Sequence, residues 1–235
     1  MNMDCAAVMN TDCTHNRHIR SYVLRMGHFS DSQKHSYDSL AENFLIPFQD
    51  SQADLCALFG NANPVTLEIG FGMGAATALI AGANPEKNYL GMEVYRPGIG
   101  KLLWEIQKNS LANVRIIECD AALAVGKMLS DSSLDAIHIF FPDPWPKKRH
   151  HKRRLIQRPF TNQLCRVLKP GGYVYMVTDW EDYGKWALAE LCATEGLCNR
   201  YAGFAPAQDW RPQTGFEQKG LKKNHLIQEL YFVKT

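Results

Sequence analysis

The stretch VTLEIGFGMG, residues 65–74, decides the fold of this chain. Its first five residues are apolar or β-branched except for Glu68, which is typical of a short buried strand. The glycines that follow, Gly70, Gly72 and Gly74, let the backbone take positive φ angles and approach a ligand closely. Because residues 73–81 are rich in Ala, Leu and Ile, the sequence predicts a strand, a tight turn and then a helix.

Strands and helices continue to alternate on the carboxyl-terminal side of this unit. Further strands are predicted at residues 88–94, 114–119, 134–141, 173–178 and 225–233, and further helices at 97–107, 121–129, 155–168 and 180–195. Pro97 suits the first turn of its helix, and the run Pro170-Gly171-Gly172 predicts the end of the helix at 155–168. Repeated βα units imply a doubly wound α/β fold with a mostly parallel sheet and helices on both faces.

Acidic residues stand where the predicted strands end. Glu68, Glu93, Asp120 and Asp143 belong to the first four strands, and Asp179 follows the fifth. Sheets of this kind bind ligands at the carboxyl ends of their strands, so acids at one edge predict a binding site there. The Glu93 carboxylate has two acceptor oxygens for two vicinal ribose hydroxyls, whereas Asp120 could also cap the helix that starts at residue 121.

The glycine-rich turn fits two kinds of cofactor. Glycines at 70 and 72, Ala75, and Glu93 about 20 residues on satisfy the dinucleotide fingerprint, which leaves a nicotinamide-dependent oxidoreductase as one interpretation. The same residues, taken as Glu-x-Gly-x-Gly-x-Gly, match the first motif of methyltransferases that use S-adenosylmethionine. Asp120 favours the second interpretation, because a third acid suits the adenine end of that cofactor while Glu68 suits the ammonium at its methionine end.

The stretch FFPDPWP, residues 140–146, follows the fourth predicted strand. Pro142 and Pro144 fix the backbone on both sides of Asp143, which we expect to lie beside the transferred methyl group. Trp145 offers either a face on which a base could stack or an apolar group for the core. Because motifs of the Asp-Pro-Pro-Trp kind mark enzymes that methylate exocyclic amino groups, such an enzyme is an alternative, although the order here is Pro-Asp-Pro-Trp.

A basic run, KKRHHKRR, occupies residues 147–154. The formal net charge of the whole chain is only +2, so positive charge is concentrated in this run, which suits the phosphates of a nucleic acid. The neighbouring histidines His150 and His151 have no thiol or acidic companions in the run, and we expect no metal site. A non-catalytic RNA-binding protein on the same scaffold is a second alternative. The contacts with the RNA backbone are expected from Lys148, Arg149, Lys152, Arg153 and Arg154.

Composition limits the remaining possibilities. A chain of 235 residues, 46% of them hydrophobic, fits a single globular α/β domain with short extensions. No apolar run approaches the roughly 20 residues that span a bilayer, and the first 13 residues lack the apolar stretch of a signal peptide. Seven scattered cysteines without a Cys-x-x-Cys pair predict reduced thiols. We therefore expect a cytoplasmic protein that needs neither a membrane nor an obligate protein partner.

The first 40 residues differ from the rest of the chain. Basic residues such as Arg17, Arg20 and Arg25 alternate there with apolar ones such as Ile19 and Tyr22. This pattern predicts a basic, partly mobile arm at residues 1–40, followed by a single domain at residues 41–235.

Taken together, these motifs resemble those of the bacterial tRNA (guanine-N7)-methyltransferases. The resemblance rests on the glycine-rich turn, on FFPDPWPKK at residues 140–148, on Thr178-Asp179 and on TGFEQKG at residues 214–220. The segment from Arg17 to Tyr22 looks like the arm of that family, so the similarity runs from about residue 17 to the last residue. It implies the Rossmann-like class I methyltransferase fold, with a mostly parallel seven-stranded sheet.

The resemblance also implies an activity and its site residues. The family transfers a methyl group from S-adenosylmethionine to N7 of a guanine in the variable loop of tRNA. Asp143 would be catalytic. The cofactor would contact Glu68, Gly70, Gly72, Gly74, Glu93, Asp120 and Asp143. The substrate would contact Lys147, Asp179, Thr214, Phe216 and Glu217.

Overall fold

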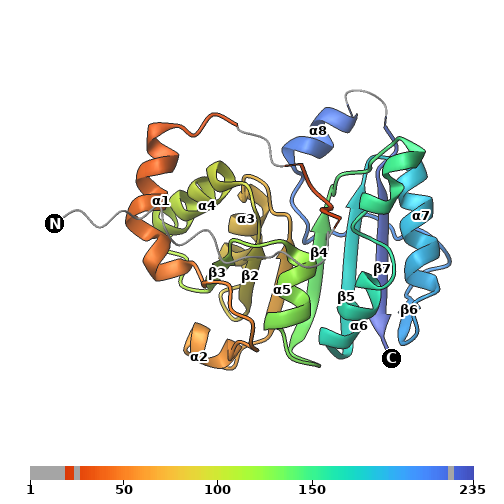
Figure 1. Ribbon diagram of the computed structural model, residues 1–235, viewed down its shortest axis with the longest axis horizontal. Helices are drawn as coiled ribbons and strands as arrows, with labels where there is room; N and C mark the ends of the chain where they lie inside the picture. The colour runs from red at the N-terminus through yellow and green to blue at the C-terminus, as the bar shows by residue number, and fades with distance from the viewer. Residues whose placement is uncertain (1–18, 24–26, 222–224) are drawn as a thin grey trace.

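The computed structural model describes residues 19–23, 27–221 and 225–235, which build a seven-stranded sheet with helices on both faces (Figure 1). The strand order is β3-β2-β1-β4-β5-β7-β6. β1 to β5 run parallel, and β7 is antiparallel to both β5 and β6. The strands are β1 (Val65–Ile69), β2 (Asn88–Met92), β3 (Val114–Ile117), β4 (Leu134–Phe140), β5 (Leu168–Thr178), β6 (Leu197–Asn199) and β7 (Gln228–Lys234).

Helices cover the sheet in two layers. The helices are α1 (Asp31–Phe44), α2 (Leu55–Phe59), α3 (Ala75–Ala83), α4 (Arg96–Lys108), α5 (Ala121–Met128), α6 (Phe160–Val167), α7 (Glu181–Cys192) and α8 (Gly215–Leu221), with a 3-10 helix η1 (Lys148–Arg153). In β4, Ile137 and Ile139 pack in the core shared with α5, α6 and α7, whereas Phe140 packs in the core shared with α3 and α4. This alternation along a strand confirms the doubly wound α/β class. In the described residues, no helix is long and apolar enough to cross a membrane.

One predicted helix begins five residues later than expected and is followed at once by a strand. The sequence suggests a helix at residues 155–168, but α6 begins at Phe160 and β5 already begins at Leu168. Pro159 explains the late start, since a proline disfavours helical backbone in the residue before it. Gly171 and Gly172 do not end a helix. They lie in β5, where the pairing with β4 shifts register between Leu134 and Ala136.

The N-terminal region contains a helix that the sequence pattern does not predict. Ser30 and Gln33 form a capping box, in which the Gln33 N–H donates to Ser30 Oγ (3.3 Å) and the Ser30 N–H donates to Gln33 Oε1 (3.0 Å). The helix α1 packs against α4 at Gly100, where an added Cβ would lie 2.3 Å from the Gln33 carbonyl oxygen. The predicted boundary at residue 40 therefore falls inside a packed helix.

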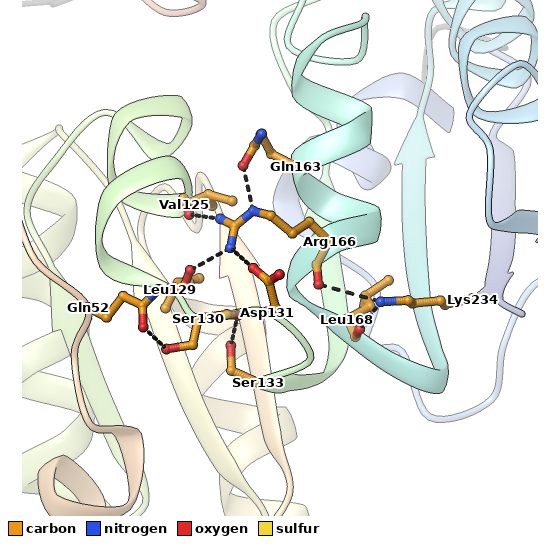
Figure 2. Close-up of polar contacts among 10 residues, drawn as sticks. All are labelled: Gln52, Val125, Leu129, Ser130, Asp131, Ser133, Gln163, Arg166, Leu168 and Lys234. Carbon is orange, nitrogen blue, oxygen red and sulfur yellow. Dashed lines mark hydrogen bonds and ion pairs between the residues drawn. The ribbon is translucent and has the colours of Figure 1, made fainter.

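Arg166, near the end of α6, links the segments that lead into β4 and β5 (Figure 2). Its guanidinium donates to the carbonyl oxygens of Val125 and Leu129 at the end of α5, both at 2.9 Å. It also pairs with Asp131 (2.6 Å) and donates to Gln163 Oε1 (2.7 Å). Arginine side chains commonly satisfy the last carbonyl groups of a helix in this way. One side chain thus fixes α5, α6 and the loop before β4 to one another.

Candidate active site

The glycine-rich turn joins β1 to α3 in the conformation that the sequence predicts. Gly70, Gly72 and Gly74 have φ angles of 73°, 57° and 70°, a region that favours glycine. A Cβ added at Gly74 would lie 2.6 Å from the Cβ of Leu102, so close packing of α3 on α4 also requires glycine there. At Gly70 and Gly72 an added Cβ would meet nothing within 4 Å, which leaves space above the turn for a ligand.

Glu68 lies on β1 beneath this turn, with only 3% of its surface exposed. Burial raises the pKa of Glu68 to about 7, and the nearby Glu93 carboxylate acts in the same direction. A cationic ligand group would relieve both effects by favouring the ionised carboxylate. The site is therefore suited chemically to a ligand that carries an ammonium or a sulfonium.

Glu93, at the end of β2, is held by three backbone donors. Its carboxylate accepts from the N–H groups of Gly72 (2.8 Å), Val94 (2.7 Å) and Tyr95 (3.1 Å). Burial raises the pKa of Glu93, while these hydrogen bonds lower it. Because a carboxylate has about four lone-pair sites, acceptor capacity remains on Oε2 for a ligand hydroxyl group. The contact with Gly72 places the Glu93 carboxylate beside the glycine-rich turn, and its contact with a ribose stays a prediction.

Asp120 follows β3 and caps α5 by accepting a hydrogen bond from the Ala122 N–H at 2.9 Å. Tyr22, from the N-terminal region, lies close enough to Asp120 to be affected by its charge. Burial raises the pKa of Tyr22, and the Asp120 charge raises it further. The neighbouring Ser21 carbonyl accepts from the Trp145 indole N–H at 2.7 Å. The segment at residues 19–23 therefore extends from the end of β3 toward the end of β4. The sequence pattern indicates only a basic arm here, and nothing in it predicts this place beside the acids.

Asp143 lies in an unusual turn after β4. Phe141 and Trp145, on either side of it, have positive φ angles of 51° and 46°, which non-glycine residues rarely adopt. The Asp143 side chain is exposed, and its charge contributes to the raised pKa of Glu93. The acids that follow β2 and β4 are therefore neighbours across the sheet edge, as predicted.

Trp145 does not present an open face for a base in this structure. The Arg153 guanidinium carbon lies 4.9 Å from the centre of its ring, and His150 approaches it edge-on at 5.7 Å between ring centres. With its N–H bound to Ser21, the indole links the turn, the basic run and the N-terminal segment.

The basic run forms η1 and a short flank, with most of its cations facing solvent. Lys147 precedes the helix, and the exposed or half-buried members of the run are Lys147, Lys148, Arg149, Lys152 and Arg153. Arg154 is different, because its side chain has no exposed surface. The prediction that Arg154 contacts the RNA backbone is therefore wrong. Its guanidinium donates to the Pro144 carbonyl oxygen (3.0 Å) and pairs with Asp182 instead.

Asp179 follows β5 and lies beside a groove of about 580 Å³ that also contacts Lys185 and Leu226. The ring of His225 lies with Nδ1 3.2 Å from Asp179 Oδ2. Gly220 of α8 lies close to the same oxygen, since a Cβ added there would be 3.0 Å from it. Asp179 is thus placed between the carboxyl edge of the sheet and the segment that carries α8.

Thr214 and Glu217 form a capping box at the start of α8. The Glu217 N–H donates to Thr214 Oγ1 (3.1 Å), and the Thr214 N–H lies 3.4 Å from Glu217 Oε2. Glu217 is buried and pairs through both oxygens with Arg211, at 2.5 Å and 2.9 Å. Contacts of Thr214 and Glu217 with substrate remain predictions. Phe216 lies in α8, but its side chain is outside the described part of the structure.

Arg211 is a buried residue that the sequence motifs do not identify. Besides Glu217 it pairs with Glu229 of β7 at 2.7 Å, and the Tyr175 hydroxyl donates to the same glutamate. Although burial opposes it, the hydrogen bonds from Arg211 lower the pKa of Glu217. The spacing Thr214-x-x-Glu217 is a capping-box pattern that could have located this helix start, whereas no local pattern identifies Arg211 as its anchor.

Comparison with known proteins places the chain among methyltransferases. A family model described as "Putative methyltransferase" matches residues 62–230. A tRNA (guanine-N(7)-)-methyltransferase of Nitrosomonas eutropha is 53% identical over 217 residues, covering 92% of this chain and 97% of the relative. One of Neisseria meningitidis serogroup B is 49% identical over 223 residues, covering 95% and 94%.

Similar folds occur among solved structures. The 16S rRNA methyltransferase KamB has a TM-score of 0.56 at 12% identity, covering 90% of this chain and 97% of that chain. The antibiotic-resistance methyltransferase Kmr has a TM-score of 0.54 at 15% identity, covering 80% and 94%. At such identities the likeness shows the methyltransferase fold alone. Because its curated relatives are about half identical over nearly their whole length, the chain belongs to the tRNA (guanine-N7)-methyltransferase family.

Proposed function

We propose that this protein transfers a methyl group from S-adenosylmethionine to N7 of a guanine in the variable loop of tRNA. The relatives that carry this activity in their names support the reaction. In this chain the proposal rests on one observation. The turn that contains Asp143 joins the acids at the carboxyl edge of the sheet to the cations of η1. The acids Glu68, Glu93 and Asp143 meet at the carboxyl edge, and the cations of η1 begin five residues after Asp143.

The residues of the glycine-rich turn fit S-adenosylmethionine. Positive φ angles and open space above Gly70 and Gly72 allow close approach of a ligand to the backbone. Buried Glu68 suits the cationic methionine end, the oriented carboxylate of Glu93 suits the ribose hydroxyls, and Asp120 with Tyr22 suits the adenine end. When bound, this cofactor supplies an electrophilic methyl group on a sulfonium.

Methylation of guanine N7 requires no base at the attacked atom, because N7 carries a lone pair and no proton. The protein has to align N7 with the methyl group and stabilise the purine as it becomes positively charged. We assign this role to Asp143, whose carboxylate would accept hydrogen bonds from the guanine and offset its growing charge. The turn around it is fixed by Pro142, Pro144 and the contacts of Trp145.

Guanine can be distinguished from adenine by the donors on its Watson–Crick edge. Asp179 offers carboxylate oxygens beside the groove, and these can accept from N1–H and from the exocyclic amino group. His225 holds this carboxylate from one side. Lys147, which is exposed between the turn and η1, would contact the same nucleotide.

The exposed cations of η1 suit the phosphates of the substrate. Lys148, Arg149 and Lys152 are exposed and Arg153 is half-buried, so they can approach an RNA backbone without unfolding the helix. Each phosphate neutralised should contribute about −0.9 to the slope of log K against log salt concentration for a duplex, and somewhat less for a single strand.

The test is transfer of a labelled methyl group from S-adenosylmethionine to unmodified tRNA, followed by strand scission specific for N7-methylguanine. A single cut in the variable loop is the expected result. Label on an exocyclic amine would overturn the assignment of the nitrogen. Binding of tRNA without transfer, in a preparation that also fails to bind S-adenosylmethionine, would identify a non-catalytic RNA-binding protein instead.

A further inference from the structure

Arg154 is the last residue of the basic run, and its environment is unlike that of the others. Its side chain has no exposed surface, whereas the exposed part of η1 ends immediately before it. The Arg154 N–H donates to the His151 carbonyl oxygen (2.9 Å), and this bond closes η1. The side chain then turns inward. A cation in this position cannot meet a phosphate without breaking the packing around it.

The contacts of the Arg154 side chain join the Asp143 turn to α7. Nε donates to the carbonyl oxygen of Pro144 (3.0 Å), the residue after Asp143, and Nη2 pairs with Asp182 in the first turn of α7. Its guanidinium carbon lies 5.2 Å from the ring centre of Tyr183 and 5.0 Å from that of Trp186, both on α7.

The segment after Arg154 is attached to the same helix. The Ile156 N–H donates to the Tyr183 hydroxyl (3.2 Å), and the Trp186 indole N–H donates to the Ile156 carbonyl oxygen (2.7 Å). The helix α7 begins two residues after Asp179. One buried side chain therefore lies between the two turns that carry the acids assigned to substrate.

The Asp143 turn needs such support. Two of its non-glycine residues, Phe141 and Trp145, have positive φ angles, and such conformations persist only when the surrounding structure holds them. Pro142 and Pro144 have no N–H group and add no backbone donor to the turn. The Pro144 carbonyl is one point at which the turn is attached toward α7, and Arg154 is the residue that reaches it.

We propose that Arg154 is a positioning residue for methyl transfer, which sets the backbone of the Asp143 turn relative to α7. An arginine suits this role because its planar guanidinium donates in two directions while it lies near the rings of Tyr183 and Trp186. A lysine in its place would keep the positive charge near Asp182 but would lose the rigid, planar arrangement of N–H donors. This inference rests on the role proposed for Asp143, and it gives the last cation of the run a function different from that of its neighbours.

The test compares Arg154→Gln with Arg158→Gln, which makes the same substitution at a 52% exposed arginine outside the basic run. For R154Q we expect kcat at saturating tRNA to fall by about tenfold to a hundredfold, since a misplacement of about 1 Å can have an effect of that size. Affinity for S-adenosylmethionine should fall far less than kcat, because Asp143 is one of several residues expected to contact the cofactor and the others belong to other strand ends. R158Q should leave both kcat and the KM for tRNA unchanged.

Other outcomes would overturn the proposal. Wild-type kcat with a raised KM for tRNA in R154Q would make Arg154 a phosphate contact, and a parallel loss of cofactor affinity would make it a general stabilising residue. Arg154→Lys should recover only part of kcat. If R154Q does not fold, Asp182→Asn decides, because Asp182 is 65% exposed and its replacement keeps the side-chain volume. D182N should lower kcat, and wild-type kcat in D182N would refute the inference.

Asp143→Asn, measured alongside, separates the two proposals. If D143N keeps full turnover, the role proposed for Asp143 fails whatever R154Q shows. If D143N is inactive and R154Q has wild-type kcat, only the role of Arg154 fails.

Discussion

The two ends of the sheet use the same kinds of side chain in opposite ways. At the amino ends of β4 and β5, Arg166 satisfies helix carbonyls and an aspartate at the surface (Figure 2). At the carboxyl ends, Glu68 is buried without a cationic partner among the described side chains, and Asp143 is exposed beside a row of cations. The charges at the amino end join helices and loops to one another, whereas the carboxyl end carries the acids and cations that we propose to bind cofactor and substrate.

The largest expected effect is the loss of turnover on changing Asp143. Asp143→Asn should lower kcat by about 10²–10³, the usual result of removing one group that stabilises charge in the transition state. Asp131→Asn, the same change at the amino end on a 75% exposed side chain, should leave kcat unchanged. Methyl transfer to tRNA under saturating conditions checks both variants. Equal kcat values for D143N and wild type would remove the functional distinction between the two ends.

Glu68 makes the stability of the ligand-free protein depend on pH. Its pKa is about 7 in the folded state against 4.5 in the reference state, so the folded protein holds this proton more tightly. The stabilisation that Glu68 contributes is fully present below pH 4.5 and is lost as the pH rises through about 7. The free energy of unfolding falls over this range by an amount on the order of 3 kcal/mol.

Urea denaturation between pH 4 and 8 measures this dependence as the difference between wild type and Glu68→Gln. In the variant, the free energy of unfolding should not show the decline with rising pH that Glu68 causes in wild type. Saturating S-adenosylmethionine should reduce the decline in wild type, because a cationic ligand favours the ionised carboxylate. A difference between the two proteins that does not vary with pH would show that Glu68 keeps an ordinary pKa.

Removing Arg166 should lower stability without affecting chemistry. Arg166→Met leaves two helix carbonyls without this donor, and the free energy of unfolding should fall by about 1–3 kcal/mol. Arg158→Met, at a 52% exposed arginine paired with Glu190, is the matched control and should change stability by less than about 1 kcal/mol. Chemical denaturation with a parallel kcat assay tests this. A fall in kcat for R166M at a temperature where it is folded would contradict the separation of the two ends.

The smallest effect is expected from the exposed cations. Reversing charge at Lys152 and Arg153 should weaken tRNA binding and flatten the slope of log K against log salt by about 1–2, while affinity for S-adenosylmethionine stays unchanged. Lys127→Glu, at an exposed lysine at the amino-end side of the sheet, should leave the slope as it is. Binding titrations at several salt concentrations give the comparison, and an unchanged slope in the double variant would exclude these residues as phosphate contacts.

Several features were predictable because they depend on neighbouring residues. The strand-turn-helix at residues 65–83 follows from an apolar run, three glycines and a helix-forming segment. The acids at the strand ends could be grouped from the sequence, because parallel strands end at one edge. By contrast, α1 was not among the predicted elements, although its capping box and the helical spacing of Tyr37, Leu40 and Phe44 are local signals. Its place against the fold is set by the close approach of Gly100 on α4, which no local pattern shows.

The sequence by itself determined the α/β alternation, the glycine-rich turn, the row of acids and the presence of concentrated positive charge. Only the tertiary structure decided which of those charges face solvent. Arg153 and Arg154 are adjacent and chemically identical, yet one lies over Trp145 and the other is buried against α7. The local sequence cannot distinguish the two arginines. Their surroundings come from residues as far apart in the chain as Ser21 and Trp186, which meet only when the sheet is assembled.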